Sequence, residues 1–158
     1  MPDNMEYLIR RVHYEELDEA FSLIWNTFLE FVAPDCGKEG IGTFRVNFIE
    51  NEEFKNCFKN ARQIMYGAYL KEKLVGVVSI SENNHVSCVF VDKRYHRNGI
   101  ATMLFNKIIS ELMKNQIESI RLNASPYAVP FYHIIGFKDL DTQQDFHGIL
   151  YTPMEFKI

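Results

Sequence analysis

The chain has 158 residues, of which 47% are hydrophobic and 24% charged, and its formal net charge is −4. This length and apolar content suit one globular domain over residues 1–158 with a single core. The weak negative charge and the scattered lysines argue against a nucleic-acid partner, and no apolar run reaches the roughly 20 residues that cross a bilayer. We therefore expect a cytoplasmic protein with neither nucleic acid nor membrane as a partner.

The cysteines and histidines indicate neither a disulfide nor a metal site. Cys36, Cys57 and Cys88 are odd in number and lack metal-ligand spacing, and the five histidines follow no ligand pattern. We expect free thiols in a reducing compartment and no bound metal. Cys88 lies in an apolar run and is predicted to be in the core, whereas Cys36 has no recognisable partner base that would make it a nucleophile.

The first third of the chain reads as a strand followed by helices rich in aromatic residues. Apolar residues at helical spacing predict a helix from Glu15-Glu16 to Phe31. From Glu39 to Cys57 they predict one helix, followed by a looser helical turn with Phe54 and Phe58. Core packing accounts for Trp25 and Phe28 individually. Together with Phe31, however, they supply more aromatic side chains than the apolar face of one helix usually needs for packing. Trp25 and Phe28 are therefore candidate substrate contacts.

The remainder alternates strands and helices. Three consecutive antiparallel strands, a helix, a fifth strand, a helix and a closing strand pair are predicted, in an α+β domain with a mixed sheet. The elements expected, in chain order, are strands Tyr7–Val12, Gln63–Leu70, Leu74–Ile80 and His85–Val91, a helix from Gly99 to about Lys114, strand Ile117–Asn123, a helix from Ser125-Pro126 to Gly136, and strands Phe137–Leu140 and Ile149–Phe156.

The junction after the fourth strand is suited to binding phosphate. A polar turn separates the strand ending at Val91 from the helix starting near Gly99. Backbone N–H groups at a helix N-terminus are unpaired and lie at the positive end of the helix dipole, and a glycine allows close approach to the main chain. The basic cluster Lys93, Arg94, His96 and Arg97 flanks this turn, where it would attract an anionic cofactor.

Two stretches resemble the signatures of the GNAT superfamily of acyl-CoA-dependent N-acetyltransferases. His96 stands where that family has Gln or Arg, and Gly99 and Ala101 fit the two small positions that follow. The second stretch, Asn123–Phe137, has an Asn at a strand end and then Ala, Phe-Tyr and Gly-Phe at the family's offsets. The resemblance implies a mostly antiparallel sheet that is splayed between strands four and five and flanked by helices.

The same resemblance implies where acetyl-CoA would bind as co-substrate. The pantetheine arm would pair with the main chain at Phe90 and Val91, and Asn123 would line the opening between the strands. The pyrophosphate would lie on the amides of Arg97, Asn98, Gly99, Ile100, Ala101 and Thr102. No metal is implied.

A general acid can be assigned on chemical grounds. When an amine attacks a thioester, a thiolate leaves, and a positioned phenol can supply its proton. Tyr132 is the predicted acid, since it lies in the second signature beside Phe131, and Tyr127 is the alternative phenol. A core aromatic residue with a satisfied hydroxyl is the competing interpretation of Tyr132.

An acceptor amine must also lose a proton before it attacks. Several members of the superfamily use a carboxylate near the start of strand four, and the position aligned on Gly99 here is His85, whose imidazole titrates near neutrality. A surface histidine beside a turn is the competing interpretation. Glu82, or a water chain, is the other candidate base.

The leading hypothesis is acetyl transfer from acetyl-CoA to a primary amine, preferably of a small molecule, by a monomer or homodimer. A peptide or protein amine is the alternative acceptor. A non-catalytic CoA-binding sensor or interaction module is the alternative class. A nucleotide-binding domain is weaker still, because the chain lacks the P-loop lysine and the dinucleotide fingerprint.

Overall fold

The computed structural model describes residues 6–158. The first half of the chain places a short strand and a set of helices before the central strands. These elements are β1 (Leu8–Arg11), the 3-10 helix η2 (Tyr14–Glu16), α1 (Leu17–Phe31), the 3-10 helix η3 (Ala33–Asp35), α2 (Gly37–Phe44), the π-helix η4 (Arg45–Ile49), α3 (Glu52–Lys59), β2 (Gln63–Leu70) and β3 (Lys73–Ser81).

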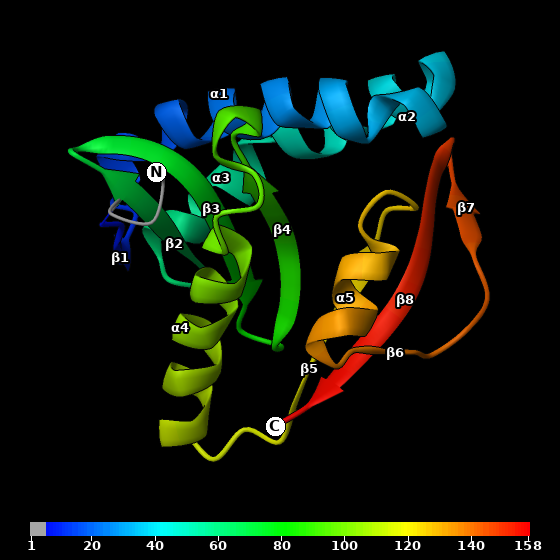
Figure 1. Cartoon of the computed structure of the whole chain (residues 1–158). Helices are drawn as coiled ribbons and strands as arrows, with labels where there is room; N and C mark the ends of the chain where they lie inside the picture. The colour runs from blue at the N-terminus through cyan, green and yellow to red at the C-terminus, as the bar shows by residue number, and fades with distance from the viewer. Residues whose placement is uncertain (1–5) are drawn as a thin grey trace.

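The second half supplies the fourth strand, two further helices and the strands that close the sheet (Figure 1). They are β4 (His85–Val91), the 3-10 helix η5 (Lys93–Tyr95), α4 (Ile100–Lys114), β5 (Ser119–Ala124), α5 (Val129–Ile135), β6 (Lys138–Asp139), β7 (Gln144–Phe146) and β8 (Ile149–Lys157). Within the described part of the chain, no helix is long and apolar enough to cross a membrane.

The predicted mixed, mostly antiparallel sheet is confirmed. Its strand order is β1-β2-β3-β4-β5-β8-β6, with β7 paired to β8, and β4–β5 is its parallel pair. Lys71 and Glu72 both have positive φ and form the two-residue turn between β2 and β3, a turn whose twist matches that of the strands it joins.

The sheet splits between β4 and β5, as Figure 1 shows. The two strands pair only at His85–Arg121 and Val86–Leu122. Beyond Val86, β4 diverges towards its end at Val91, while β5 stays paired with β8 up to Ala124. A β-bulge at Ser87 adds to this divergence, since it is the extra residue between the pairs Ser79–Cys88 and Ile80–Val86.

Helices cover both faces of the sheet, and each face has its own core. On one face α4 and α5 pack through residues such as Leu104, Phe105 and Tyr132. On the other face α1 packs Phe21 and Ile24 against the strands, with aromatic residues of α3 and η4 beside them. Burying a large apolar side chain stabilises the fold by about 1.5–3 kcal/mol, so these two layers hold the splayed sheet together.

Several strand ends shift by one or two residues from the sequence prediction, and three larger differences change an element. Phe54 and Phe58 do not belong to a loose final turn: they lie in a separate helix, α3, whose N-cap Asn51 accepts a hydrogen bond from the Phe54 N–H at 3.0 Å. The last helix begins at Val129 and not at Ser125, because residues 125–128 form a turn and Pro130 lies in the first turn of α5.

The third difference is β7, which the sequence analysis missed. Phe146 pairs with Ile149 across His147 and Gly148, whose φ angles of 47° and 91° form another two-residue hairpin turn. This hairpin packs against α2, where a Cβ on Gly40 would lie 2.4 Å from the Gly148 carbonyl oxygen. Only glycine therefore fits at position 40.

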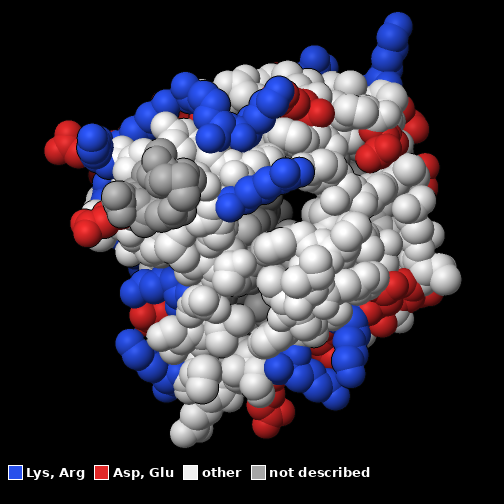
Figure 2. Space-filling model, in the orientation of Figure 1, with Lys and Arg blue, Asp and Glu red and all other residues white. Residues whose placement is uncertain are grey.

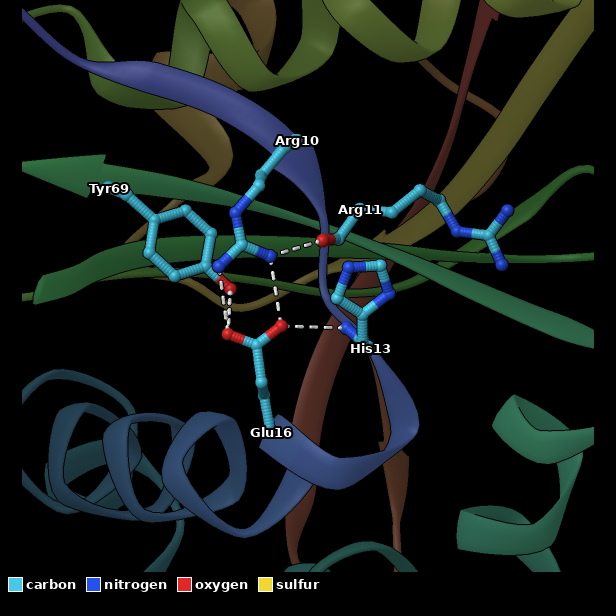
Figure 3. Close-up of polar contacts among 5 residues, drawn as sticks. All are labelled: Arg10, Arg11, His13, Glu16 and Tyr69. Carbon is cyan, nitrogen blue, oxygen red and sulfur yellow. Dashed lines mark hydrogen bonds and ion pairs between the residues drawn. The ribbon is translucent and has the colours of Figure 1, made fainter. Parts of the chain in front are cut away.

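The start of α1 is fastened to the sheet by an ion-pair cluster (Figure 3). The Arg10 guanidinium donates to both Glu16 carboxylate oxygens at 2.9 Å and lies 3.8 Å from the centre of the Tyr69 ring. The hydrogen bonds from Arg10, followed by that from the His13 N–H, lower the pKa of Glu16 to about 2 despite partial desolvation. The carboxylate thus stays charged down to strongly acid pH.

Candidate active site

The turn between β4 and α4 presents backbone N–H groups to one open space. Asp92 accepts from the Arg94 N–H at 2.9 Å and starts the turn. Arg97 and Gly99 are both left-handed, with φ of 66° and 76°, and Gly99 is the N-cap of α4. The Met103 N–H donates to the Gly99 carbonyl and makes the first backbone hydrogen bond of α4. The N–H groups that precede it at the start of the helix have no such partner and are available to a ligand.

His96 has a structural role in this turn. Its Nε2–H donates to the Val91 carbonyl at 2.7 Å, and its ring lies 4.7 Å from the Phe31 ring on α1. The family usually places Gln or Arg here, and the imidazole fixes the turn to the end of β4. Asn98 also points away from the open space and donates to the Tyr7 hydroxyl at 3.1 Å.

A cavity of about 600 Å³, the loop cavity, lies beside this turn. Its walls come from α1, from β4 beyond the split, from the turn and the start of α4, and from the segment leading into α5. Of the residues predicted to bind the co-substrate, it contains Phe90, Val91, Arg97, Gly99, Ile100, Ala101 and Thr102. A Cβ on Gly99 would have no protein atom within 4 Å, so this glycine leaves its space to a ligand.

The electrostatics of the loop cavity favour an anion. Lys93 is paired with Glu30 at 2.7 Å, and Arg94 with Asp92 at 2.9 Å. Arg97 lines the cavity, is exposed, and takes part in none of the ion pairs found among residues 6–158. Figure 2 shows a hollow in the molecular surface with Lys and Arg side chains beside it. This charge adds to the positive end of α4.

A second cavity of about 440 Å³, the aromatic cavity, continues from the first. The two cavities share Val32, Val89, Phe90, Ser125, Ala128 and Tyr132 in their linings. The aromatic cavity also contains the predicted residues Phe28 and Asn123. Two of its lining residues, Phe28 and Phe44, stack with their rings 4.0 Å apart and almost parallel, at 4°.

Tyr132 stands where the two cavities meet. Its ring is held by edge contacts with Phe105, Phe131 and Phe137 at centroid distances of 5.4 to 5.8 Å, and the residue is 6% exposed. Its hydroxyl makes no hydrogen bond with any described residue. Burial raises the pKa of Tyr132 well above its ordinary value of 10, so the phenol keeps its proton at neutral pH. Tyr127, the alternative phenol, is 55% exposed and packs on Phe31.

Other predicted residues lie outside the two cavities. His85 is half-buried at the closed end of the β4–β5 pair, where burial lowers the pKa of its imidazole, and it is not in either lining. Glu82 is in the preceding turn, 3.6 Å from Arg62. Trp25 stacks on Phe28 and Phe44 at 5.9 and 6.4 Å and so stands behind the cavity wall. The structure does not bring His85 and Tyr132 to one cavity.

Several lining residues were not predicted. Phe44, Ser87, Phe146, Leu150 and Tyr151 all contribute to the aromatic cavity. A sequence signal existed for Phe146: an apolar pair, Phe146 and Ile149, flanks the two residues His147-Gly148, a spacing typical of a hairpin. Cys88, predicted in the core, lines the floor of this cavity, and burial raises the pKa of its thiol to about 12.

Comparison with known proteins identifies the family. Residues 32–158 match the family model for the acetyltransferase (GNAT) domain. The chain belongs to the GNAT acetyltransferases. No curated protein sequence matches it. Membership of the GNAT acetyltransferases points to acyl-group transfer.

Solved structures share the GNAT fold over nearly the whole chain. The PaiA N-acetyltransferase of Thermoplasma acidophilum, in complex with coenzyme A, is 20% identical, covers 98% of this chain and 100% of its own, and superposes with a TM-score of 0.82. A GCN5-related N-acetyltransferase structure from Rhodopseudomonas palustris superposes with a TM-score of 0.84 and is 16% identical, with 98% of each chain covered. A predicted acetyltransferase with acetyl-CoA from Clostridium acetobutylicum superposes with a TM-score of 0.69 and is 17% identical, covering 89% of this chain and 96% of its own.

Proposed function

We propose that this GNAT protein transfers an acetyl group from acetyl-CoA to a primary amine of a small molecule. The observation that carries the proposal is the position of Tyr132 at the junction of two cavities, one beside an amide-rich turn and one lined by aromatic residues. The co-substrate is supported by the relatives from Thermoplasma and Clostridium, solved with coenzyme A and acetyl-CoA respectively.

The residues of the loop cavity fit the separate parts of acetyl-CoA. The free amides of the turn and of the start of α4, together with Arg97, suit a pyrophosphate. Beyond Val86, the edge of β4 that faces β5 has no strand paired to it within residues 6–158. The main chain along this edge can therefore pair with the amide-containing pantetheine arm. Phe90 and Val91, both in the lining, belong to this edge.

Acetyl-CoA supplies the acetyl thioester, and the chain supplies position and a proton. Attack by the amine nitrogen forms a C–N bond to the carbonyl carbon and breaks the C–S bond, leaving the electron pair on sulfur. Tyr132 gives its proton to that sulfur and regains one from water after release. Holding both reactants at one junction makes the step effectively unimolecular.

The amine loses its own proton without a protein base beside it. Among residues 6–158, the lining of the aromatic cavity contains no His, Asp or Glu. An apolar cavity disfavours the ammonium form, so the amine enters as the free base and releases its second proton to water after the C–N bond has formed. Of the three predicted candidates for the base, His85, Glu82 and a water chain, we therefore favour the water chain.

The test is acetyl-CoA-dependent release of CoA thiol with a panel of primary amines, together with calorimetric titration of CoA into the protein. We expect CoA binding, and thiol release that requires an amine. Binding of CoA without turnover of any amine would overturn the catalytic assignment and favour a CoA-binding sensor.

A further inference from the structure

The aromatic cavity carries information about the acceptor, because no charged side chain takes part in it. Of the lining residues, all within the described part of the chain, none is Asp, Glu, Lys or Arg. Six are aromatic: Phe28, Phe44, Phe90, Tyr132, Phe146 and Tyr151. A volume of about 440 Å³ falls in the range of small-molecule sites.

Stacked aromatic side chains form one rigid wall of the cavity, the aromatic wall of Phe28, Phe44 and Phe90. Phe44 is held between Phe28, at 4.0 Å and 4°, and Phe48, at 4.9 Å and 11°. Phe90 meets Phe44 edge-on, with centroids 6.2 Å apart and planes at 61°. Since Phe28 is 1% exposed and Trp25 stacks on it, the aromatic wall is fixed by packing before any ligand arrives. Because Phe28 and Phe48 cover the faces of Phe44, a flat apolar group meets this wall through contacts with the ring edges.

The polar groups of the cavity are few and neutral. The Ser87 hydroxyl, on the bulge of β4, donates to the Gln63 side-chain oxygen at 2.9 Å and therefore accepts from the Ser79 hydroxyl, which leaves it one lone pair for an N–H donor. The Tyr151 hydroxyl donates to Gln144 at 3.1 Å. Ser87 and Asn123 can accept a hydrogen bond from one neutral amine. Neither compensates the desolvation of a second, charged ammonium group.

One side of the cavity mouth is formed by an aromatic ring. Phe146 lines it and is 50% exposed, which places this ring at the rim. Two contacts with α2 hold the hairpin that carries it: Gly40 against Gly148, and the Thr43 hydroxyl donating to the His147 carbonyl at 2.7 Å. The rim is therefore built into the fold.

We propose that the acceptor is a monoamine whose primary amino group is attached through a short linker to an aromatic ring, an arylalkylamine. The inference rests on the proposed function and adds the substrate class. In the bound state the ring lies in the aromatic cavity against the aromatic wall, and the nitrogen lies near Ser87 and Tyr132. Polyamines are excluded because their second ammonium group would be buried without a partner.

The experiment compares kcat/KM for 2-phenylethylamine, butylamine and spermidine, with calorimetric CoA binding measured in parallel. We expect 2-phenylethylamine to exceed both other amines by on the order of 10-fold or more, the factor that an apolar pocket achieves for a well-fitting group. Spermidine turned over as well as or better than 2-phenylethylamine would overturn this inference and leave the proposed function standing. CoA binding without turnover of any amine would overturn both.

Variants at the rim and in the aromatic wall locate the effect. Phe44→Ala should lower kcat/KM for 2-phenylethylamine on the order of 10-fold and leave CoA affinity unchanged. Because Phe44 is also part of the core, Phe146→Ala is the second variant: its ring is half-exposed, so the fold tolerates the change, and the aromatic preference should fall several-fold. Met113→Ala, on the last turn of α4 and 61% exposed, is the matched control. An unchanged amine preference in both Phe variants would contradict the assignment.

Discussion

Replacing Tyr132 by Phe removes one hydroxyl and leaves every ring contact in place. The edge contacts with Phe105, Phe131 and Phe137 involve only the ring, and the hydroxyl has no hydrogen-bond partner among the described residues. The free energy of unfolding should therefore change by less than about 1 kcal/mol. Loss of a general acid costs about 10²–10⁴ in rate, or about 2.7–5.4 kcal/mol of transition-state stabilisation.

The assay is steady-state thiol release at saturating acetyl-CoA, paired with thermal unfolding of both proteins. We expect kcat to fall at least 100-fold while the melting temperature stays within a few degrees. Tyr127→Phe is the matched control, because this phenol lines the same loop cavity but is more than half-exposed. Full activity of Tyr132→Phe would refute the role of the hydroxyl, and an equal loss in both variants would refute the choice between the two phenols.

The pKa of Tyr132 also predicts the alkaline side of the pH profile. Burial raises this pKa above its ordinary value of 10, so the donating, protonated form persists through neutral and mildly alkaline pH. The rate should therefore rise with pH as the acceptor loses its proton. No decline in rate is expected at any pH up to 10. A decline between pH 8 and 9 would contradict a raised pKa.

Three further predictions address the turn, the half-buried His85 and the ion-pair cluster. Gly99→Ala should cost about 1–2 kcal/mol of stability, because φ is 76°, and should weaken CoA binding by calorimetry, since the new methyl group meets no protein atom and occupies ligand space; unchanged CoA affinity would be the contrary result. His85→Gln should leave kcat/KM within about twofold, as His85 lines neither cavity; a loss of 100-fold would restore it as the base. Glu16→Gln should remove about 1 kcal/mol at pH 7, a figure reduced for solvent screening of a partly exposed pair. Because the pKa of Glu16 is lowered to about 2, its contribution is complete above its ordinary pKa of 4.5 and is lost as pH falls towards 2, so urea unfolding of the variant should depend less on pH in that window.

Local patterns were sufficient for most of the fold. β2, β3 and β4 are continuous apolar runs separated by charged turns, and α4 has one apolar stripe, so each could be found from residues close together in the chain. The start of α5 was misplaced because two prolines compete there. Pro126 lies in a turn, and only Pro130 occupies the first helical turn.

The bulge at Ser87 limits what alternation can predict. A regular strand puts residues i and i+2 on the same face, yet Val86 belongs to the core under α4 and Cys88 to the core under α1. The extra residue between them reverses the alternation, and it also places Ser87 in the aromatic cavity. Nothing in the local composition of His85–Val91 marks this reversal.

The aromatic cavity depends on contacts between distant parts of the chain. Phe44 and Phe146 meet there because Thr43 and His147, 104 positions apart, are joined by a hydrogen bond. A motif of fixed spacing can reveal the turn at Gly99 and the tyrosine at 132. It does not show which helix before β2 faces the last hairpin. The sequence therefore predicts Trp25 as a substrate contact, whereas the structure has Phe44 in the cavity lining.

The split between β4 and β5 gives the sheet two edges inside the molecule. A free strand edge ordinarily recruits strands of other proteins and leads to aggregation. Here the β4 edge opens into a cavity walled by Phe31 of α1, by Val32, which follows that helix, and by Phe131 of α5. The sheet thereby offers backbone hydrogen bonds to a slender extended ligand while the flanking helices shield the same edge from neighbouring polypeptides.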